Sequence, residues 1–142
     1  MTVFSFDPKQ VTLVIGGFLI GGFADDDFIS IKRDQDGWAK KVGVSGEIGR
    51  VQNLDISGSI TIRLLQSSES NDALSTLAAL DESQGIAATY SLCRDKNGRS
   101  VFASPFVWVK KYPDVQYKKD VAILEWVLDT AQLLIYVGGL NA

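Results

Sequence analysis

The sequence predicts a mainly β protein, an antiparallel β barrel or sandwich with one short helix, at about residues 70–81, packed on its side. Two observations support this class. Short β-prone runs bounded by turn residues recur along most of the 142 residues. Polar and apolar side chains alternate over 57–64, which is the period of a strand with one buried face. We expect residues 1–142 to form a single domain.

The N-terminal half is predicted to consist of strands and turns. Asp25-Asp26-Asp27 is expected to be a turn, and the glycine pairs at 16–17 and 21–22 predict bends. A loop at 34–37 is expected to tip a hairpin formed by residues 28–42. The runs expected to be strands are 2–6, 10–15, 18–20, 28–33, 43–50 and 57–63.

One helix is predicted, and strands follow it. The hydroxyl of Ser70 is expected to cap the helix, and Gly85 is expected to end it. Within the helix, Leu74, Leu77 and Ala78 share one face. Beyond it, an Asn-Gly turn at 95–98 predicts a hairpin. The runs expected to be strands in this half are 86–94, 99–111, 115–120, 121–130 and 132–137.

Composition and charge exclude several functions. The 14 basic and 17 acidic residues give a net charge of −3, which argues against tight binding to nucleic acid. The absence of histidine removes the commonest general base, the usual zinc ligand and the Ser-His-Asp triad. The single cysteine, Cys93, is expected to be a small buried hydrophobic residue. The apolar run at 11–23 is too short to span a bilayer as a helix and no signal peptide opens the chain, so we expect a soluble protein without membrane contact.

No constellation of residues predicts a catalytic, metal or cofactor site. The aspartates at 25–27 lack the spacing of a calcium loop and are interpreted as a solvated turn. The serines at 67–70 have no accompanying base, so they are interpreted as the beginning of the helix. Trp38, Trp108 and Trp126 could surround a ligand, but strand tryptophans are more often core or interface anchors.

Four basic doublets need a separate explanation. They are Lys32-Arg33, Lys40-Lys41, Lys110-Lys111 and Lys118-Lys119. Adjacent residues in a strand point to opposite faces, so a doublet inside a strand would direct one cation toward a closed core. The simpler explanation is that the doublets lie at strand ends. The other is that some strand faces meet further copies of the chain, which favours assembly into a ring.

Several segments together resemble a known family. They are GVSGEI at 43–48, DISGSITI at 55–62, LLQ at 64–66, SESND at 68–72, and Leu74 with Leu77. In this order the segments resemble the tail tube proteins of contractile-tailed bacteriophages, over residues 10 to about 128. That family is similar in fold to the type VI secretion tube protein.

The resemblance implies a structural subunit without enzyme activity or cofactor. Copies would form hexameric rings that stack into a hollow tube inside a contractile sheath. The implied partners are other copies of the chain, the sheath protein and the tape measure protein, while DNA would pass through the lumen without specific binding. The implied location is the tail of the virion, assembled in the cytoplasm of the bacterial host.

Two sets of residues are expected to serve this assembly. The polar residues of the strands at 43–50 and 57–63 are expected to face the channel: Ser45, Glu47, Ser57, Ser59, Thr61 and Arg63. Residues of the predicted hairpin are expected to contact neighbouring subunits: Lys32, Arg33, Asp34, Asp36, Trp38, Lys40 and Lys41.

Other functions stay open from sequence alone. The tube could belong to a contractile bacteriocin or a secretion machine, because these use the same fold. A small-ligand-binding β barrel, with the three tryptophans around a pocket, is a different class. An enzyme is the last alternative, since aspartate and glutamate alone would have to supply the acid–base chemistry.

Overall fold

The computed structural model describes residues 10–24, 28–85, 89–96 and 98–139. The elements are β1 (Val11–Ile15), β2 (Phe18–Ile20), β3 (Ile29–Arg33), β4 (Trp38–Val42), β5 (Ile48–Gln52), β6 (Gly58–Leu65), α1 (Ser70–Gln84), β7 (Thr89–Asp95), β8 (Val101–Lys111), β9 (Ile123–Thr130) and β10 (Leu134–Tyr136). All pairings between these strands are antiparallel. The prediction of a mainly β fold with one helix is confirmed.

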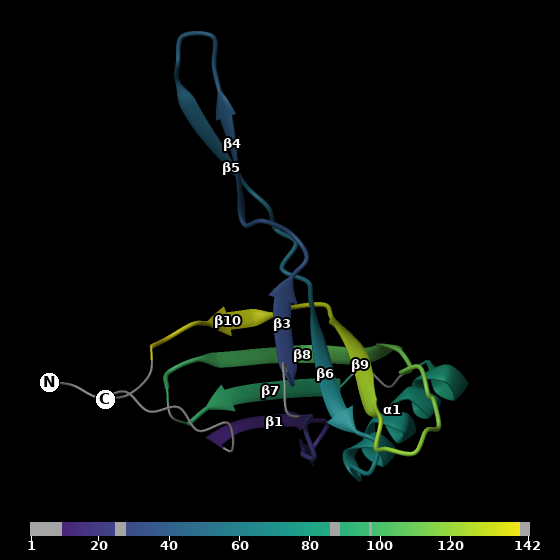
Figure 1. Cartoon of the computed structure of the whole chain (residues 1–142). Helices are drawn as coiled ribbons and strands as arrows, with labels where there is room; N and C mark the ends of the chain where they lie inside the picture. The colour runs from purple at the N-terminus through teal and green to yellow at the C-terminus, as the bar shows by residue number, and fades with distance from the viewer. Residues whose placement is uncertain (1–9, 25–27, 86–88, 97, 140–142) are drawn as a thin grey trace, which may run out of the picture.

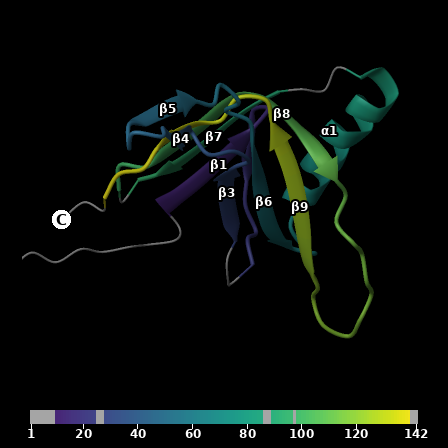
Figure 2. The same ribbon diagram turned by 90° about the horizontal axis from the view of Figure 1, so that it is seen from above.

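Most strands belong to one curled sheet, in the order β2-β1-β7-β8-β9-β6-β3, with β10 also paired to β8. Figure 2 shows β6 and β9 running at a marked angle to β1 and β7. Within the described residues the sheet does not close into a barrel, because its end strands β2 and β3 do not pair. The chain that leaves β2 nevertheless bridges to β6, through Phe23 and Leu64. The curl therefore encloses a core.

The core follows from the alternation of side chains along the strands. In β6, Ile60, Ile62 and Leu64 are buried, and in the paired strand β9 Trp126 and Leu128 meet them. The core cluster as a whole comprises Leu13, Ile15, Ile20, Ile60, Ile62, Leu64, Leu74, Cys93, Val107, Trp126 and Leu128. The expectation that Cys93 is a small buried hydrophobic residue is confirmed.

The helix begins and ends close to its predicted limits. Gly85 ends it in the left-handed conformation, at φ 67°, and its N–H donates to the carbonyl of Asp81 at 2.7 Å. The predicted cap is wrong, because the hydroxyl of Ser70 accepts from the N–H of Gly21 at 2.9 Å. Glu69 holds the cap position without a side-chain hydrogen bond. The serine thus ties the helix to the chain after β2.

Asn71 organises the corner between β6 and α1. Its amide nitrogen donates to the carbonyls of Leu65 and Ser68, at 3.1 and 3.0 Å. Its amide oxygen accepts from the indole N–H of the buried Trp126 at 2.9 Å. Ser68 completes the corner, since its hydroxyl donates to the carbonyl of Gly21 at 2.6 Å. This corner therefore explains the polar side chains of Ser68, Ser70 and Asn71.

Some expected elements differ from the structure. Residues 115–120 form no strand, because they belong to the exposed connection between the directly paired strands β8 and β9. The hairpin of β7 and β8 is confirmed. The expected strand at 2–6, the turn at 25–27 and Asn97 lie outside the described residues.

Candidate functional site

A polar face covers β3, β6 and β9 on the side opposite the core. Ser59, Thr61 and Arg63 alternate with the buried residues of β6 and therefore point to this side. Cross-strand pairing continues the face in rows: Lys32–Ser59–Asp129, Ser30–Thr61–Val127 and Arg63–Glu125. We call this surface, made by these eight residues, the polar face.

The polar face carries charges of both signs. Arg63 and Glu125 form an ion pair with Nε 3.3 Å from Oε2, and their side chains are 35% and 51% exposed. A pair this exposed contributes no more than about 1 kcal/mol to stability. Lys32 and Asp129 add one charge of each sign, and the face contains a hollow of ≈ 450 Å³. Its charges balance, so this surface attracts neither polyanions nor polycations strongly.

The expected channel residues divide into two groups. Ser59, Thr61 and Arg63 lie together on the polar face, although Ser59 is only 7% exposed. Ser57 precedes β6 and donates its hydroxyl to Asp34 at 3.4 Å. Ser45 and Glu47 lie elsewhere, in a turn, so the prediction of a strand over 43–50 is wrong for residues 43–47.

The chain reverses at 43–47 for a local reason. The N–H of Gly43 donates to the carbonyl of Glu47 at 2.7 Å, and Gly46 has φ 84°. A left-handed glycine in a loop of this length is a common way to close a hairpin. The strands on either side, β4 and β5, pair along their full length, from Trp38 opposite Gln52 to Val42 opposite Ile48.

The hairpin of β4 and β5, residues 38–52, stands away from the sheet, and we call it the arm (Figure 1). Every residue of the arm is exposed. Among them are large apolar side chains, including Trp38 at 49% and Ile48 at 70% exposure. An isolated two-stranded hairpin is only marginally stable in water. Exposed apolar side chains on such an element are typical of a surface that contacts another protein.

The predicted hairpin of residues 28–42 is wrong. β3 pairs with β6 and β4 pairs with β5, so residues 34–37 lie at the root of the arm and not at a tip. At this root the N–H of Asp34 donates to the carbonyl of Ser57 at 3.1 Å, and the N–H of Asn53 donates to the carbonyl of Gly37 at 2.8 Å. Asp36 lies in the same exposed link.

The expected inter-subunit residues are spread from the sheet to the arm. Trp38, Lys40 and Lys41 lie in β4. Lys32 belongs to the polar face. Arg33, at the end of β3, donates Nε and Nη2 to the carbonyl of Leu133, at 3.1 and 2.8 Å, so it holds the sheet to the chain before β10.

The basic doublets mostly follow the simpler explanation. Lys32-Arg33 and Lys110-Lys111 lie at the ends of β3 and β8, and Lys118-Lys119 lies in the exposed connection before β9. Lys40-Lys41 is the exception, because it lies inside β4 and both of its side chains are exposed.

Electrostatically the arm is basic. Lys40 lies directly opposite Arg50 in the ladder. The Arg50 guanidinium carbon is 4.0 Å from the centroid of the Trp38 ring, a cation–π contact. The one carboxylate in the arm belongs to Glu47 in its turn.

The three tryptophans do not form a ligand box. Trp38 lies on the arm, and Trp126 lies in the core against Tyr112, with ring centroids 5.9 Å apart. Trp108 is paired with Asp129 and therefore lies on the opposite face of the sheet from Trp126. The geometry offers no support for the ligand-binding barrel.

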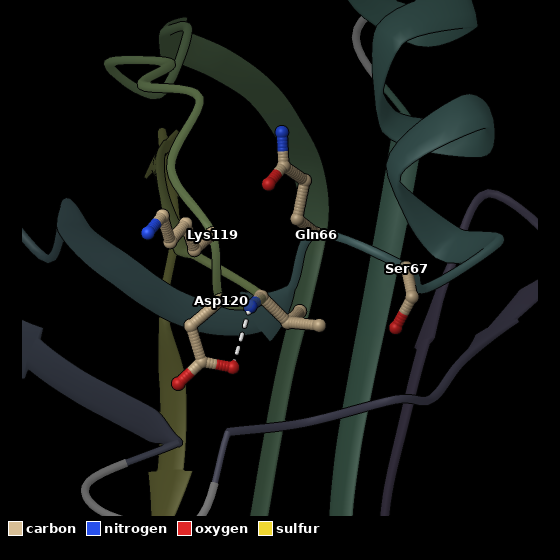
Figure 3. A pocket seen from close by; sticks show the side chains of 5 residues that line it. Gln66, Ser67, Lys119 and Asp120 are labelled. Atoms are coloured by element: carbon tan, nitrogen blue, oxygen red, sulfur yellow. Dashed lines mark hydrogen bonds between the residues drawn. The ribbon is translucent and has the colours of Figure 1, made fainter.

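No catalytic arrangement is evident at the second hollow, of ≈ 360 Å³, beside the corner between β6 and α1. Figure 3 shows Gln66, Ser67, Lys119 and Asp120 pointing in different directions around it. Among the described residues, no group of three or more acidic or cysteine side chains could hold a metal ion. In the same part of the chain no helix is both long and apolar enough to cross a membrane.

Two sequence comparisons identify relatives. The sequence model of the bacteriophage PhiTE tail tube protein family matches residues 1–138. A structural protein of Pseudomonas phage KPP10, ORF10, is 29% identical over 143 residues, which cover 95% of this chain and 83% of that protein.

The fold is also similar to solved structures. The sheath/tube terminator of an extracellular contractile injection system, PVC, aligns with a TM-score of 0.61 at 13% identity, over 96% of this chain and 100% of that one. The tube terminating cap of the anti-feeding prophage aligns with a TM-score of 0.62 at 8% identity, over 96% of this chain and 93% of that one. A chain of the PVC sheath–tube complex aligns with a TM-score of 0.58 at 13% identity, over 93% and 91%. At these identities the likeness concerns the fold.

Proposed function

Because the chain belongs to the bacteriophage PhiTE tail tube protein family, we propose that it is a tail tube subunit whose copies form stacked hexameric rings around a channel for DNA. The family is structural and not enzymatic, and its members are components of the phage tail. The location that follows is the tail of the virion, assembled in the cytoplasm of the host.

The observation that carries the proposal is the polar face on strands whose other side forms the core. A channel wall needs a surface that is wetted on one side and anchored on the other, and β3, β6 and β9 supply both. Its mixed charges suit a lumen through which a polyanion slides, since a strongly basic wall would retain DNA. Ser59, Thr61, Arg63 and Glu125 are the channel residues in this proposal.

The arm supplies the contact between subunits. It places Trp38, Lys40 and Lys41 on an exposed hairpin outside the sheet. The proposed partners are therefore further copies of the chain, together with a sheath protein outside the tube and a tape measure protein within it. The similarity to a chain from a sheath–tube complex supports the sheath as a partner.

A second candidate is the tube of a contractile injection system or bacteriocin. The fold similarity to the PVC and anti-feeding prophage proteins supports this second candidate. Both candidates share the ring and the lumen, and they differ in cargo. Tubes purified from a lysate with their contents distinguish them, because a phage tube ends on a DNA-filled capsid.

The test combines microscopy with labelling of the channel. Purified protein at high concentration is expected to give rings and tubes in electron micrographs. In a Cys93→Ala background, Thr61→Cys is expected to react with a small maleimide in both free subunits and tubes. A long polyethylene-glycol maleimide is expected to label it in free subunits only, because the polymer does not enter the lumen.

Three results contradict the proposal or part of it. A monomer at every concentration, without rings, contradicts the tube function. Equal labelling of tubes by the long reagent places Thr61 on the outside. Protection from both reagents places it in a subunit interface and contradicts the assignment of the polar face to the lumen.

A further inference from the structure

Charge is distributed unevenly between the arm and the helix. The arm carries three cations, Lys40, Lys41 and Arg50, against Glu47, for a net charge of +2. Residues 69–84, which include all of α1, carry four carboxylates and no lysine or arginine, for a net charge of −4. The carboxylates are Glu69, Asp72, Asp81 and Glu82. The whole chain has a net charge of only −3, so the arm and the helix carry local charge excesses of opposite sign.

The two elements lie at opposite ends of the same strand. The arm leaves the body next to Gly58, the first residue of β6, and α1 follows Leu65, the last residue (Figure 1). An eight-residue strand separates its ends by about 25 Å. The arm points away from the helix of its own chain, so contact between them has to join two copies head to tail. A head-to-tail contact of this kind repeats in one direction and produces a stack.

One face of the arm combines exposed apolar side chains with two like charges that lie opposite each other. Trp38, Lys40 and Val42 alternate along β4 and so share this face, with Arg50 and Ile48 opposite them on β5. The pair of Lys40 and Arg50 places like charges directly across the ladder, which destabilises a hairpin. Apolar side chains lie at both ends of the pair and are exposed. A partner surface that carries carboxylates among apolar groups would be complementary to this face of the arm.

The α1 end of the body has that composition. Glu69, Asp72 and Glu82 are exposed, and Leu80 in the same helix is 42% exposed. Tyr112, directly after β8, adds an aromatic ring that is 41% exposed. The helix of fifteen residues is about 22 Å long, and five paired residues of the arm span about 17 Å, so the two elements match in length.

We propose that the arm of one copy docks the face of Trp38, Lys40 and Val42 on the α1 end of a copy in the next ring, with Lys40 and Arg50 against the helix carboxylates. The inference rests on the proposed stacking of rings and adds the acceptor surface. It also gives the stack a direction, since every arm points the same way along the tube.

A charge-swap experiment tests the pairing. The arm variant is Lys40→Glu with Arg50→Glu, which keeps two like charges opposite each other in the hairpin. The helix variant is Asp72→Lys with Glu82→Lys, and a third protein combines all four substitutions. The matched control, Arg94→Glu with Lys96→Glu, makes the same change in net charge as the arm variant at two exposed positions on β7 and just beyond it.

Stacking is measured by sedimentation and by tube length in micrographs, and folding by circular dichroism. In the arm and helix variants, the protein concentration needed for stacking is expected to rise about tenfold or more, because like charges then meet. The combined variant is expected to return to about the wild-type value, and the control is expected to stay there. Added salt is expected to weaken stacking of the wild type.

The outcomes separate the two proposals. If the wild type forms no rings or tubes, the proposed function fails and the inference fails with it. If rings form and the arm and helix variants stack like the wild type, only the inference is overturned. If the arm variant loses stacking and the combined variant does not recover it, the acceptor is not the helix, and the tube function stands.

Discussion

Replacing Asn71 by alanine should greatly lower the free energy of unfolding of the subunit. In Asn71→Ala the indole N–H of Trp126, a residue only 2% exposed, loses its acceptor. An orphaned buried donor costs about 1–3 kcal/mol. Two carbonyls also lose a donor, at about 0.5–1.5 kcal/mol each, and the better helix propensity of alanine returns about 0.5 kcal/mol. We expect a loss of about 2–5 kcal/mol, a large fraction of a typical total of about 5–15 kcal/mol.

The assay is urea unfolding, followed by tryptophan fluorescence at concentrations too low for rings to form. Asn71→Asp is the matched variant, because it keeps an oxygen acceptor for Trp126 and removes the donors. A double-mutant cycle with Trp126→Phe isolates the indole bond, with an expected coupling of about 1–2 kcal/mol. A loss below about 1 kcal/mol for Asn71→Ala, or a coupling near zero, would refute this account of the corner.

Three further predictions concern the sheet, the arm and the thiol. A Cβ at Gly58 would lie 2.5 Å from the carbonyl oxygen of Lys32, so Gly58→Ala should lower the free energy of unfolding by about 1–3 kcal/mol. Gly49 has open space around it, so Gly49→Ala should change the free energy of unfolding by less than about 0.5 kcal/mol in the same urea titration. Replacing residues 43–47 by Asn-Gly should leave the unfolding midpoint unchanged and shorten or abolish tubes in micrographs; long tubes at the same concentration and salt would show that the turn of the arm takes no part in stacking. Burial raises the pKa of Cys93 from 9.0 to about 11, so the stability of the wild type relative to Cys93→Ala should be greatest below pH 9 and should decrease as the pH rises through 11, and a pH-independent difference would contradict this.

Several features of the fold could be predicted because their causes are local. The alternation over Ser59 to Leu64 fixes which side of that strand is apolar, whatever strand pairs with it. The helix was predicted from its apolar spacing, and its end from a glycine that adopts the left-handed conformation. The resemblance to tail tube proteins was confirmed by the family match over residues 1–138.

The location of the arm could not be predicted in the same way. Two segments, 34–37 and 43–47, contain glycine and polar residues, and either can reverse a chain. The choice depends on whether β3 pairs with β4 or with β6, and that pairing joins residues far apart in sequence. Because the predicted pairing was wrong, residues 34–37 were expected at the tip of the hairpin, whereas they lie at its root. For the same reason Ser45 and Glu47 were expected in a channel strand, whereas they lie in a turn.

The sequence by itself determined the class of fold, the helix and the two-sided character of β6, because backbone propensity and side-chain period act between near neighbours. Only the tertiary structure decided that Glu125 and Asp129 join the polar face, since β9 meets β6 through an antiparallel ladder whose register no local signal encodes. It also decided that the arm is exposed on both faces, because burial depends on what the rest of the chain covers.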